Sequence, residues 1–243
     1  MILLLDFGNT SLQYAIYEVN NCLDSGKHIG DTKVFLEHIK NQYPQINRLM
    51  YSDVRGGQSN VIQDIFPSIP TWSLRTSHLN YPFTNLYKTP ETLGADRKAL
   101  ATAAFFKFPK AHCLIIDAGS CITYDFLDKE GRYHGGAISP GIWMRYEALH
   151  RQTGKLPQLT PTPPKDFLGT QTTDAIHAGV YFGVCGEVEY HIEAYRKEYT
   201  HLNIILTGGD HQWLSKSIKK PIFAEPNFLM EGMFALSQFN RNS

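Results

Sequence analysis

The sequence predicts an α/β protein made of two related halves, and three observations support this. Residues 2–13 read ILLLDFGNTSLQ, an apolar run that ends at an aspartate and turns at a glycine. Residues 114–124 read LIIDAGSCITY and repeat this order nearly half a chain later, which indicates an internal duplication. Segments with strand and helix periodicity alternate after each copy, as they do in α/β layer architectures.

The composition of the chain limits the partners it is expected to have. It has 243 residues, of which 42% are hydrophobic, enough for one or two cores. Its 23 Lys and Arg residues balance its 23 Asp and Glu residues, so no overall charge favours nucleic acid or an anionic membrane. No apolar run approaches the roughly 20 residues of a membrane span. We expect a soluble, cytoplasmic protein with a small neutral or anionic ligand.

The first half, residues 1–110, is expected to begin with a β-hairpin. The apolar run that ends at Asp6 and the alternating segment 11–18 predict two strands around the turn DFGNT. Further along, apolar spacing predicts a helix over 34–42, a strand over 48–54 and a short helix over 61–66.

Residues 70–90 are rich in Pro, Thr, Asn and Tyr, and they predict a loop with one or two short strands. The Ala-rich segment after Gly94 predicts a helix with Asp96 in its first turn, and Pro109 ends this helix. The first half therefore mixes strands and helices as an α/β layer requires.

The second half, residues 111–243, is expected to begin with the same hairpin. Strands are predicted over 112–117 and 121–127, and a third strand runs into the segment GGAISPG. Later elements are a helix over 142–151, a Pro-rich loop, a long helix over 173–197 and a strand over 203–207. Glycines usually weaken a helix, so those of the long helix predict close packing of another helix or backbone: Gly179, Gly183 and Gly186.

Glycine turns follow several of the predicted strands, in DFGNT, DAGSC and LTGGD. Glycine has no Cβ and lets backbone N–H groups approach a phosphate, and neighbouring hydroxyl and amide groups add donors. An aspartate in such a turn cannot bind phosphate directly, but it can hold a cation that bridges to it. One Asp–Gly turn is ordinary, so the duplication is what indicates phosphate and metal chemistry. The P-loop and Rossmann glycine motifs do not occur in this sequence.

Two halves that each open with such a hairpin are typical of the actin, chaperone ATPase and sugar kinase superfamily. Within it, the chain resembles type III pantothenate kinase over nearly its whole length. The resemblance is carried by DFGNT (6–10), YxxPxxLGADR (87–97), DAGS (117–120), GGxISPG (135–141), TxxLP (153–157), GTQTTDAIxxG (169–179) and LTGGD (206–210). It implies two ribonuclease H-like, actin-like ATPase domains, 1–110 and 111–243, with a nucleotide cleft between them.

The resemblance implies transfer of the γ-phosphate of ATP to the primary hydroxyl of pantothenate, the first step of coenzyme A synthesis. It further implies a homodimer that uses Mg²⁺ or another divalent cation and a monovalent cation, K⁺ or NH₄⁺. Two alternatives remain open: a non-catalytic relative that acts as a regulatory accessory factor, and a kinase of the same superfamily with another small-molecule acceptor. The carboxylates Asp6, Asp96 and Asp117 argue against the first.

The resemblance assigns Asp96 as the general base, and a carboxylate beside a hydroxyl can take its proton. The alternative is a helix-start carboxylate favoured by the helix dipole. Arg97 favours the first reading, because a cation in the first turn opposes the dipole and suggests an anionic partner. Asp6 is expected to hold Mg²⁺ through ATP, and Asp117 a monovalent cation.

The remaining site residues also come from the resemblance. Expected ATP contacts are Asp6, Phe7, Gly8, Asn9, Thr10, Ser11, Leu12, Gln13, Ser120, Gly208 and Gly209. Expected pantothenate contacts are Tyr87, Gly94, Ala95, Asp96, Arg97 and Thr172, the last from the other subunit. Without the family, Tyr87 reads as a core aromatic and Thr172 as a helix cap. Family members often carry Thr at Ser120 and Asn at Gln171.

Overall fold

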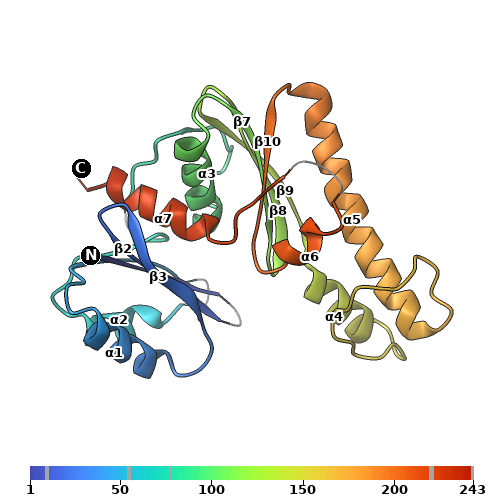
Figure 1. Ribbon diagram of the computed structural model, residues 1–243, viewed down its shortest axis with the longest axis horizontal. Helices are drawn as coiled ribbons and strands as arrows, with labels where there is room; N and C mark the ends of the chain where they lie inside the picture. Colours follow the sequence, from blue (N-terminus) through green and yellow to red (C-terminus); the bar gives the residue numbers. More distant parts are fainter. Residues whose placement is uncertain (9–10, 54–55, 77, 219–221, 242–243) are drawn as a thin grey trace. The chain divides into compact units, whose positions relative to one another are not determined.

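The computed structural model describes residues 1–243 except 9–10, 54–55, 77, 219–221 and 242–243. The chain divides into two compact units (Figure 1). Unit 1 consists of Met1–Pro82, Glu91–Ala103 and Leu229–Ser243, and unit 2 of Phe83–Pro90 and Ala104–Phe228. The sequence-based division at residue 110 groups the C-terminal segment with the second half, whereas here this segment belongs to unit 1.

Unit 1 contains a five-stranded sheet in the order β3-β2-β1-β4-β5. Its strands are β1 (Ile2–Phe7), β2 (Leu12–Glu18), β3 (Asn21–His28), β4 (Arg48–Asp53) and β5 (Thr71–Ser73). β1 pairs antiparallel with β2 and parallel with β4, so it lies at the centre. Because side chains alternate between the faces of a strand, the apolar run of β1 supplies both faces of the sheet.

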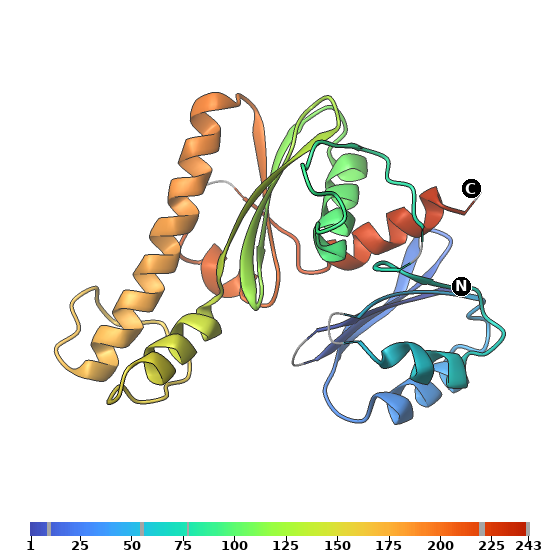
Figure 2. The same ribbon diagram turned by 180° about the vertical axis from the view of Figure 1, so that it is seen from behind.

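Helices cover both faces of this sheet. On one face, Leu3 and Leu5 pack with apolar side chains of α1 (Thr32–Gln42) and α2 (Gln58–Ile65). Figure 2 shows both helices on the same face of this sheet. On the other, Ile2 and Leu4 pack with α3 (Ala95–Lys107) and α7 (Phe228–Phe239). The first turn of α3 is therefore held against the sheet that carries Asp6.

Unit 2 contains a six-stranded sheet in the order β11-β10-β7-β8-β9-β6. Its strands are β6 (Thr84–Asn85), β7 (His112–Ala118), β8 (Cys121–Leu127), β9 (Arg132–Pro140), β10 (Leu202–Thr207) and β11 (Phe223–Ala224). As in unit 1, three consecutive antiparallel strands are followed by two strands that pair parallel beside the first. Five strands of each sheet thus share one topology, and β6 is added at the edge of the second sheet, beside β9. This shared topology confirms the predicted α/β fold with an internal duplication.

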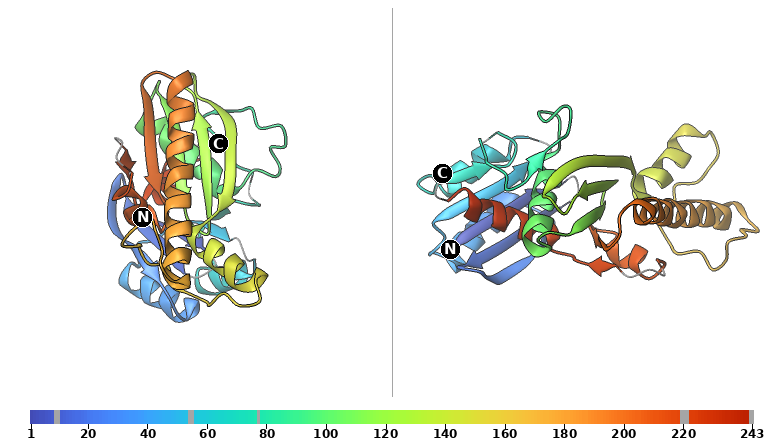
Figure 3. Two further views of the ribbon diagram at one scale, coloured as in Figure 1. Left: turned by 90° about the vertical axis from the view of Figure 1, so that its right-hand side faces the viewer. Right: turned by 90° about the horizontal axis from the view of Figure 1, so that it is seen from above.

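One face of the second sheet is covered by α4 (Ile142–Gln152), α5 (Thr172–Glu198) and α6 (His211–Ser215). α5 runs along this sheet, as the left view of Figure 3 shows. The Glu187 carboxylate fastens it, because it accepts hydrogen bonds from the hydroxyls of Tyr124 (2.8 Å) and Ser139 and pairs with Arg145 of α4 (2.5 Å). Among the helices formed by the described residues, none is long and apolar enough to cross a lipid bilayer.

Candidate active site

Asp6 lies near the end of the central strand of unit 1. It is the one polar residue of β1, and it is opposite Gln13 of β2 and Ser52 of β4. Ser52 is buried, and its hydroxyl donates a hydrogen bond to the Asp6 carboxylate. β1 and β4 run parallel, so both residues lie at the carboxyl edge of the sheet, where ligands of α/β proteins commonly bind.

The surroundings of Asp6 oppose its negative charge. Burial is the largest cause and raises the pKa of Asp6 to about 6; the hydrogen bond from Ser52 acts against this, and the negative charge of Asp96 adds to it. A bound cation would relieve the repulsion. A carboxylate oxygen suits Mg²⁺, which usually takes one or two carboxylates together with phosphate oxygens. The residues present therefore fit a divalent cation that arrives with a nucleotide.

Asp96 stands in the first turn of α3, where it is partly buried. Its Oδ1 accepts a hydrogen bond from the backbone N–H of Arg97 at 2.8 Å. A Cβ at Gly94 would collide with this same oxygen, so the Asp96 carboxylate can take this position only because residue 94 is a glycine. Arg97 is buried, and the neighbouring Ala95 packs with the core between sheet and helix. Four residues assigned to the acceptor site thus lie together in unit 1.

The turn after β1 is closed by backbone hydrogen bonds. The Gly8 N–H lies 3.2 Å from the carbonyl of Asp6 and 3.1 Å from that of Ser11. Asn9 and Thr10, both expected at ATP, lie outside the described residues. The next residues return into β2, which begins at Leu12. The described residues on either side of this gap, Gly8 and Ser11, are therefore joined by a backbone hydrogen bond at the carboxyl edge of the sheet.

A cavity of about 200 Å³ adjoins this turn and is lined by Phe7, Gly8, Ser11, Leu12, His28, Ile29, Gly30, Thr32, Asp53 and Gln58. Phe7 and Leu12 are at most 5% exposed and belong to the apolar core on the α1 and α2 face. Their side chains thus support the turn. Gln13 is partly buried on β2 opposite Asp6.

In unit 2, Asp117 occupies the place on β7 that Asp6 occupies on β1. It is opposite Thr207 of the parallel strand β10, a buried hydroxyl residue like Ser52. Gly208 follows with φ +89°, and a Cβ there would collide with Asp117 Oδ1 and the carbonyl of Ala118. Asp117 and the turn of Gly208 and Gly209 are thereby brought together. This oxygen-rich corner fits a cation with hard oxygen ligands.

Ser120 lies in the turn between β7 and β8 and is exposed. Its carbonyl accepts a hydrogen bond from the Gly141 N–H at 3.1 Å, and the Gly119 N–H donates to the carbonyl of Cys121 at 2.9 Å. The glycine turn of Asp117 is thus joined to the one that ends β9. The Ser120 side chain is at the surface of unit 2, where a ligand can reach its hydroxyl.

Tyr87 and Thr172 lie in other parts of unit 2. The Tyr87 ring packs over Gly135, where a Cβ would lie 2.8 Å from Cδ2, and its centroid is 6.4 Å from that of Tyr133. Thr172 is the first residue of α5, and its predecessor Gln171 makes no side-chain cap. Thr172 lines an apolar groove of about 830 Å³ with residues of α4 and α5, among them Arg145 and Leu149.

No sequence motif marks the hydroxyl residues that lie opposite the two aspartates. Ser52 lies within the segment 48–54, which predicts only a strand, and Thr207 ends the strand predicted over 203–207. The signal was present in the duplication, because the strand that pairs parallel with each aspartate strand carries a hydroxyl residue opposite the aspartate, Ser52 on β4 and Thr207 on β10.

Comparison with known proteins agrees with this geometry. The family model described as "Type III pantothenate kinase" matches residues 2–194. A type III pantothenate kinase of Flavobacterium psychrophilum is 40% identical over 99% of this chain and 100% of its own length. One of Bacteroides fragilis is 36% identical over 99% and 98%.

Solved structures show the same fold at lower identity. A protein described as a conserved Baf family transcriptional activator from Campylobacter jejuni has a TM-score of 0.63 at 22% identity, over 99% of this chain and 100% of that one. The activator of 2-hydroxyisocaproyl-CoA dehydratase from Clostridium difficile, solved with bound ADPNP, has a TM-score of 0.56 at 13% identity, over 99% and 94%. The family match covers most of the chain, and the relatives span it from end to end. The chain belongs to the type III pantothenate kinase family.

Proposed function

We propose that this chain transfers the γ-phosphate of ATP to the primary hydroxyl of pantothenate and so forms 4'-phosphopantothenate. The observation that carries this proposal is that Asp6 lies on β1 while Asp96 lies in the first turn of α3, the helix that packs with Ile2 and Leu4 of the same strand. The negative charge of Asp96 also adds to the raised pKa of Asp6. A phosphoryl-transfer site needs one carboxylate for a metal ion and one to orient or deprotonate the hydroxyl. Family membership supplies the acceptor.

Asp96 acts as the general base in this proposal. The N–H of Arg97 holds Oδ1, which leaves Oδ2 to accept the proton of the pantothenate hydroxyl as its oxygen attacks phosphorus. Arg97 is buried beside it, and a guanidinium suits the pantothenate carboxylate or the transferring phosphoryl group. We assign Gly94, Ala95, Tyr87 and Thr172 as further pantothenate contacts, on the family motifs that they match.

Asp6 holds a divalent cation together with ATP. The ion supplies charge neutralisation at the transferring phosphoryl group. We assign residues 6–13 as contacts of the ATP phosphates, on the family motif, because glycine lets a phosphate approach the backbone. We assign Ser120, Gly208 and Gly209 as further ATP contacts, on the family motifs. Positioning and electrostatics account for most of the acceleration in such reactions.

Asp117 holds a monovalent cation, K⁺ or NH₄⁺. Two oxygen groups support this assignment, the Asp117 carboxylate and the carbonyl of Ala118. Both lie close to Gly208, which has no Cβ to collide with them. Oxygen ligands of this kind suit hard cations. The duplicated aspartates thus have different roles, one for the nucleotide metal and one for a monovalent ion.

The protein acts as a cytoplasmic homodimer in this proposal, and the outer face of α5 supports the dimer. Gly179, Gly183 and Gly186 follow helical spacing on one face, and no described atom lies within 4 Å of where their Cβ atoms would be. Tyr190 continues the same stripe and is 71% exposed. Small residues let a second helix approach closely. A second copy packed here would lie beside the groove that contains Thr172.

The test is ATP turnover by the purified protein with and without pantothenate, in potassium and then in sodium buffer. We expect ADP to form only with pantothenate and faster in potassium. ADP formation with a sugar or acetate as acceptor would support another kinase of the superfamily. ATP binding without turnover on any of these acceptors would support an accessory factor.

A further inference from the structure

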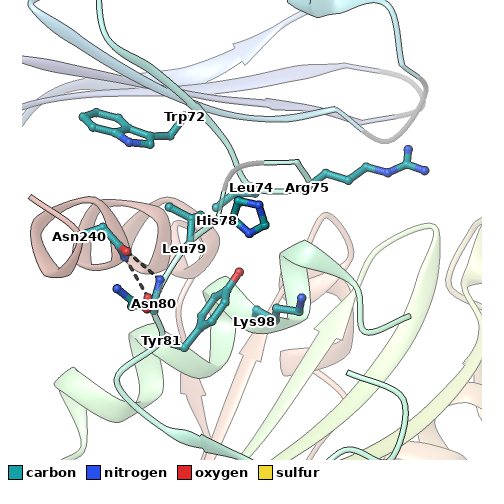
Figure 4. Close-up of a pocket in the computed structure, with 9 residues that line it drawn as sticks. All are labelled: Trp72, Leu74, Arg75, His78, Leu79, Asn80, Tyr81, Lys98 and Asn240. Atoms are coloured by element: carbon teal, nitrogen blue, oxygen red, sulfur yellow. Dashed lines mark hydrogen bonds between the residues drawn. The ribbon is translucent and has the colours of Figure 1, made fainter. Parts of the chain in front are cut away.

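A second cavity of unit 1 contains none of the residues assigned to the kinase reaction. It has a volume of about 540 Å³, within the usual range for small-molecule sites. Its walls come from β5, the loop that follows it, α3 and the residue that follows α7 (Figure 4). The lining residues are Trp72, Leu74, Arg75, His78, Leu79, Asn80, Tyr81, Lys98 and Asn240.

The described lining of this cavity contains basic side chains and no carboxylate. Arg75, His78 and Lys98 line it, and no Asp or Glu occurs among its described lining residues. The chain as a whole carries a formal net charge of zero, so this local excess is not a reflection of the composition. A concave, basic surface raises the local concentration of small anions.

The wall beside these groups is fixed by hydrogen bonds. The Asn80 N–H donates to Asn240 Oδ1 at 2.7 Å, and Asn240 Nδ2 donates to the Asn80 carbonyl at 2.9 Å. Asn240 is buried, and Nδ2 also donates to the carbonyl of Leu236 within α7. The loop is thereby fastened to a helix that packs on the sheet, which lowers the entropy lost on binding.

Aromatic rings complete the cavity. Lys98 Nζ lies 5.5 Å from the centroid of the Tyr81 ring, a cation–π contact that places the ammonium while leaving its N–H groups able to donate. Figure 4 shows the Tyr81 hydroxyl pointing toward His78, with Trp72 on another wall and Arg75 extending outward at the rim. Burial raises the pKa of Tyr81, so the phenol remains a neutral donor.

We propose that this cavity, here named the basic pocket, binds a phosphate-bearing small molecule at a site separate from the kinase site. Lys98, His78 and Arg75 supply donors that a phosphate group accepts through several oxygens at once. The faces of Trp72 and Tyr81 suit an organic part of the ligand. Lys98 is two residues after Asp96 on α3, so the basic pocket and the proposed base share one helix. Binding to the pocket does not depend on the proposed function.

The test is titration of the purified protein with pyrophosphate while the fluorescence of Trp72 is followed, with calorimetry as the second readout. We expect a saturable, single-site change that is absent in Trp72→Phe, although calorimetry still detects binding there. Lys98→Ala and Arg75→Ala should each weaken this binding about 10-fold, the effect of losing one charge-assisted contact. Lys33→Ala removes an exposed charge of α1 and should leave it unchanged.

Any of three results would overturn the proposal of a phosphate site in the basic pocket. They are the absence of a Trp72-dependent signal in the folded wild type, a loss of affinity in Lys33→Ala equal to that in Lys98→Ala, and binding of sulfate and citrate as tight as that of pyrophosphate at matched ionic strength. Circular dichroism checks that each variant is folded, and Lys98→Gln replaces Lys98→Ala if the latter is not. If the wild-type protein binds pyrophosphate in this pocket but shows no pantothenate kinase activity, the proposed function is refuted and the basic pocket is not.

Discussion

Ser52 and Asp6 lie opposite each other on the parallel strands β4 and β1, and the Ser52 hydroxyl donates a hydrogen bond to the Asp6 carboxylate. This bond partly offsets the burial that raises the pKa of Asp6 to about 6. The buried hydroxyl thus keeps the carboxylate ionised, and able to bind a cation, at a lower pH than burial alone would allow.

Ser52→Ala should therefore raise the pKa of Asp6 further. One hydrogen bond is worth about 0.5–1.5 kcal/mol, so the shift should be about 0.4–1 pH unit. Asp6 is protonated and loses its cation as pH falls through its pKa, and the acid limb of the kcat/KM profile should move to higher pH by this amount. Ser25→Ala, an exposed hydroxyl on β3, is the control. If the acid limb of the kcat/KM profile is unchanged in Ser52→Ala, titration of Asp6 is not the cause of that limb.

Asp6→Asn should abolish turnover yet stabilise the protein at pH 8 without ligand. The pKa of Asp6 is raised in the folded state, so its ionised form opposes folding above pH 6. Removing the charge should increase the free energy of unfolding by about 1–3 kcal/mol. The gain should shrink as pH falls from 6 toward 4, because the wild-type carboxyl then becomes neutral in the folded state. Urea unfolding of wild type and variant at pH 8 and at pH 4 measures the gain in stability. A variant less stable than wild type at pH 8 would contradict the electrostatic explanation.

Gly208→Ala should damage the corner at Asp117. The residue has φ +89°, and its Cβ would collide with Asp117 Oδ1. Left-handed backbone and overlap together should cost about 1–3 kcal/mol and weaken the potassium dependence of turnover. Thermal unfolding and activity against potassium concentration check this. The matched control is Gly154→Ala, where no described atom lies within 4 Å of the new Cβ. Equal effects of the two substitutions would argue against a cation site at Asp117.

Gly183→Leu should dissociate the proposed dimer without destabilising the subunit. No described atom lies within 4 Å of the Cβ position, so the side chain fits the single chain, and Leu favours a helix over Gly by about 1 kcal/mol. A second helix could no longer approach. Light scattering after gel filtration should give a monomer for this variant and a dimer for wild type and for Glu198→Leu, an exposed control on α5. A wild-type monomer would remove the dimer from the proposal.

The sequence allowed most strands and helices to be predicted where apolar periodicity was strong. The long helix expected over 173–197 is α5, Thr172–Glu198, and the strand expected over 121–127 is β8. β3 was not predicted, because it is a mostly exposed edge strand whose residues NCLDSGKH show no apolar alternation. α7 was not predicted either. Its residues FLMEGMFALSQF are apolar around most of the helix, so periodicity gives little signal.

Residues of the candidate site that belong to a sequence motif could be predicted. Residues that reach the site only through long-range contacts of the fold could not. Asp6 and Asp96 follow from motifs, but their proximity depends on α3 packing against the sheet that contains β1. Ser52 meets Asp6 through the register of two strands separated by a hairpin and a helix. The return of α7 to unit 1 is likewise a long-range contact that local patterns do not encode.

Asp96 takes the proton of the pantothenate hydroxyl in the proposed reaction. The most direct test of this role is the rate of 4'-phosphopantothenate formation, followed by mass spectrometry, in wild type and Asp96→Asn at saturating ATP and pantothenate. We expect a loss of about 10²- to 10⁴-fold in kcat, the contribution of a general base, with ATP affinity and thermal stability retained. Asp96→Asn that forms 4'-phosphopantothenate at the wild-type rate would contradict the account.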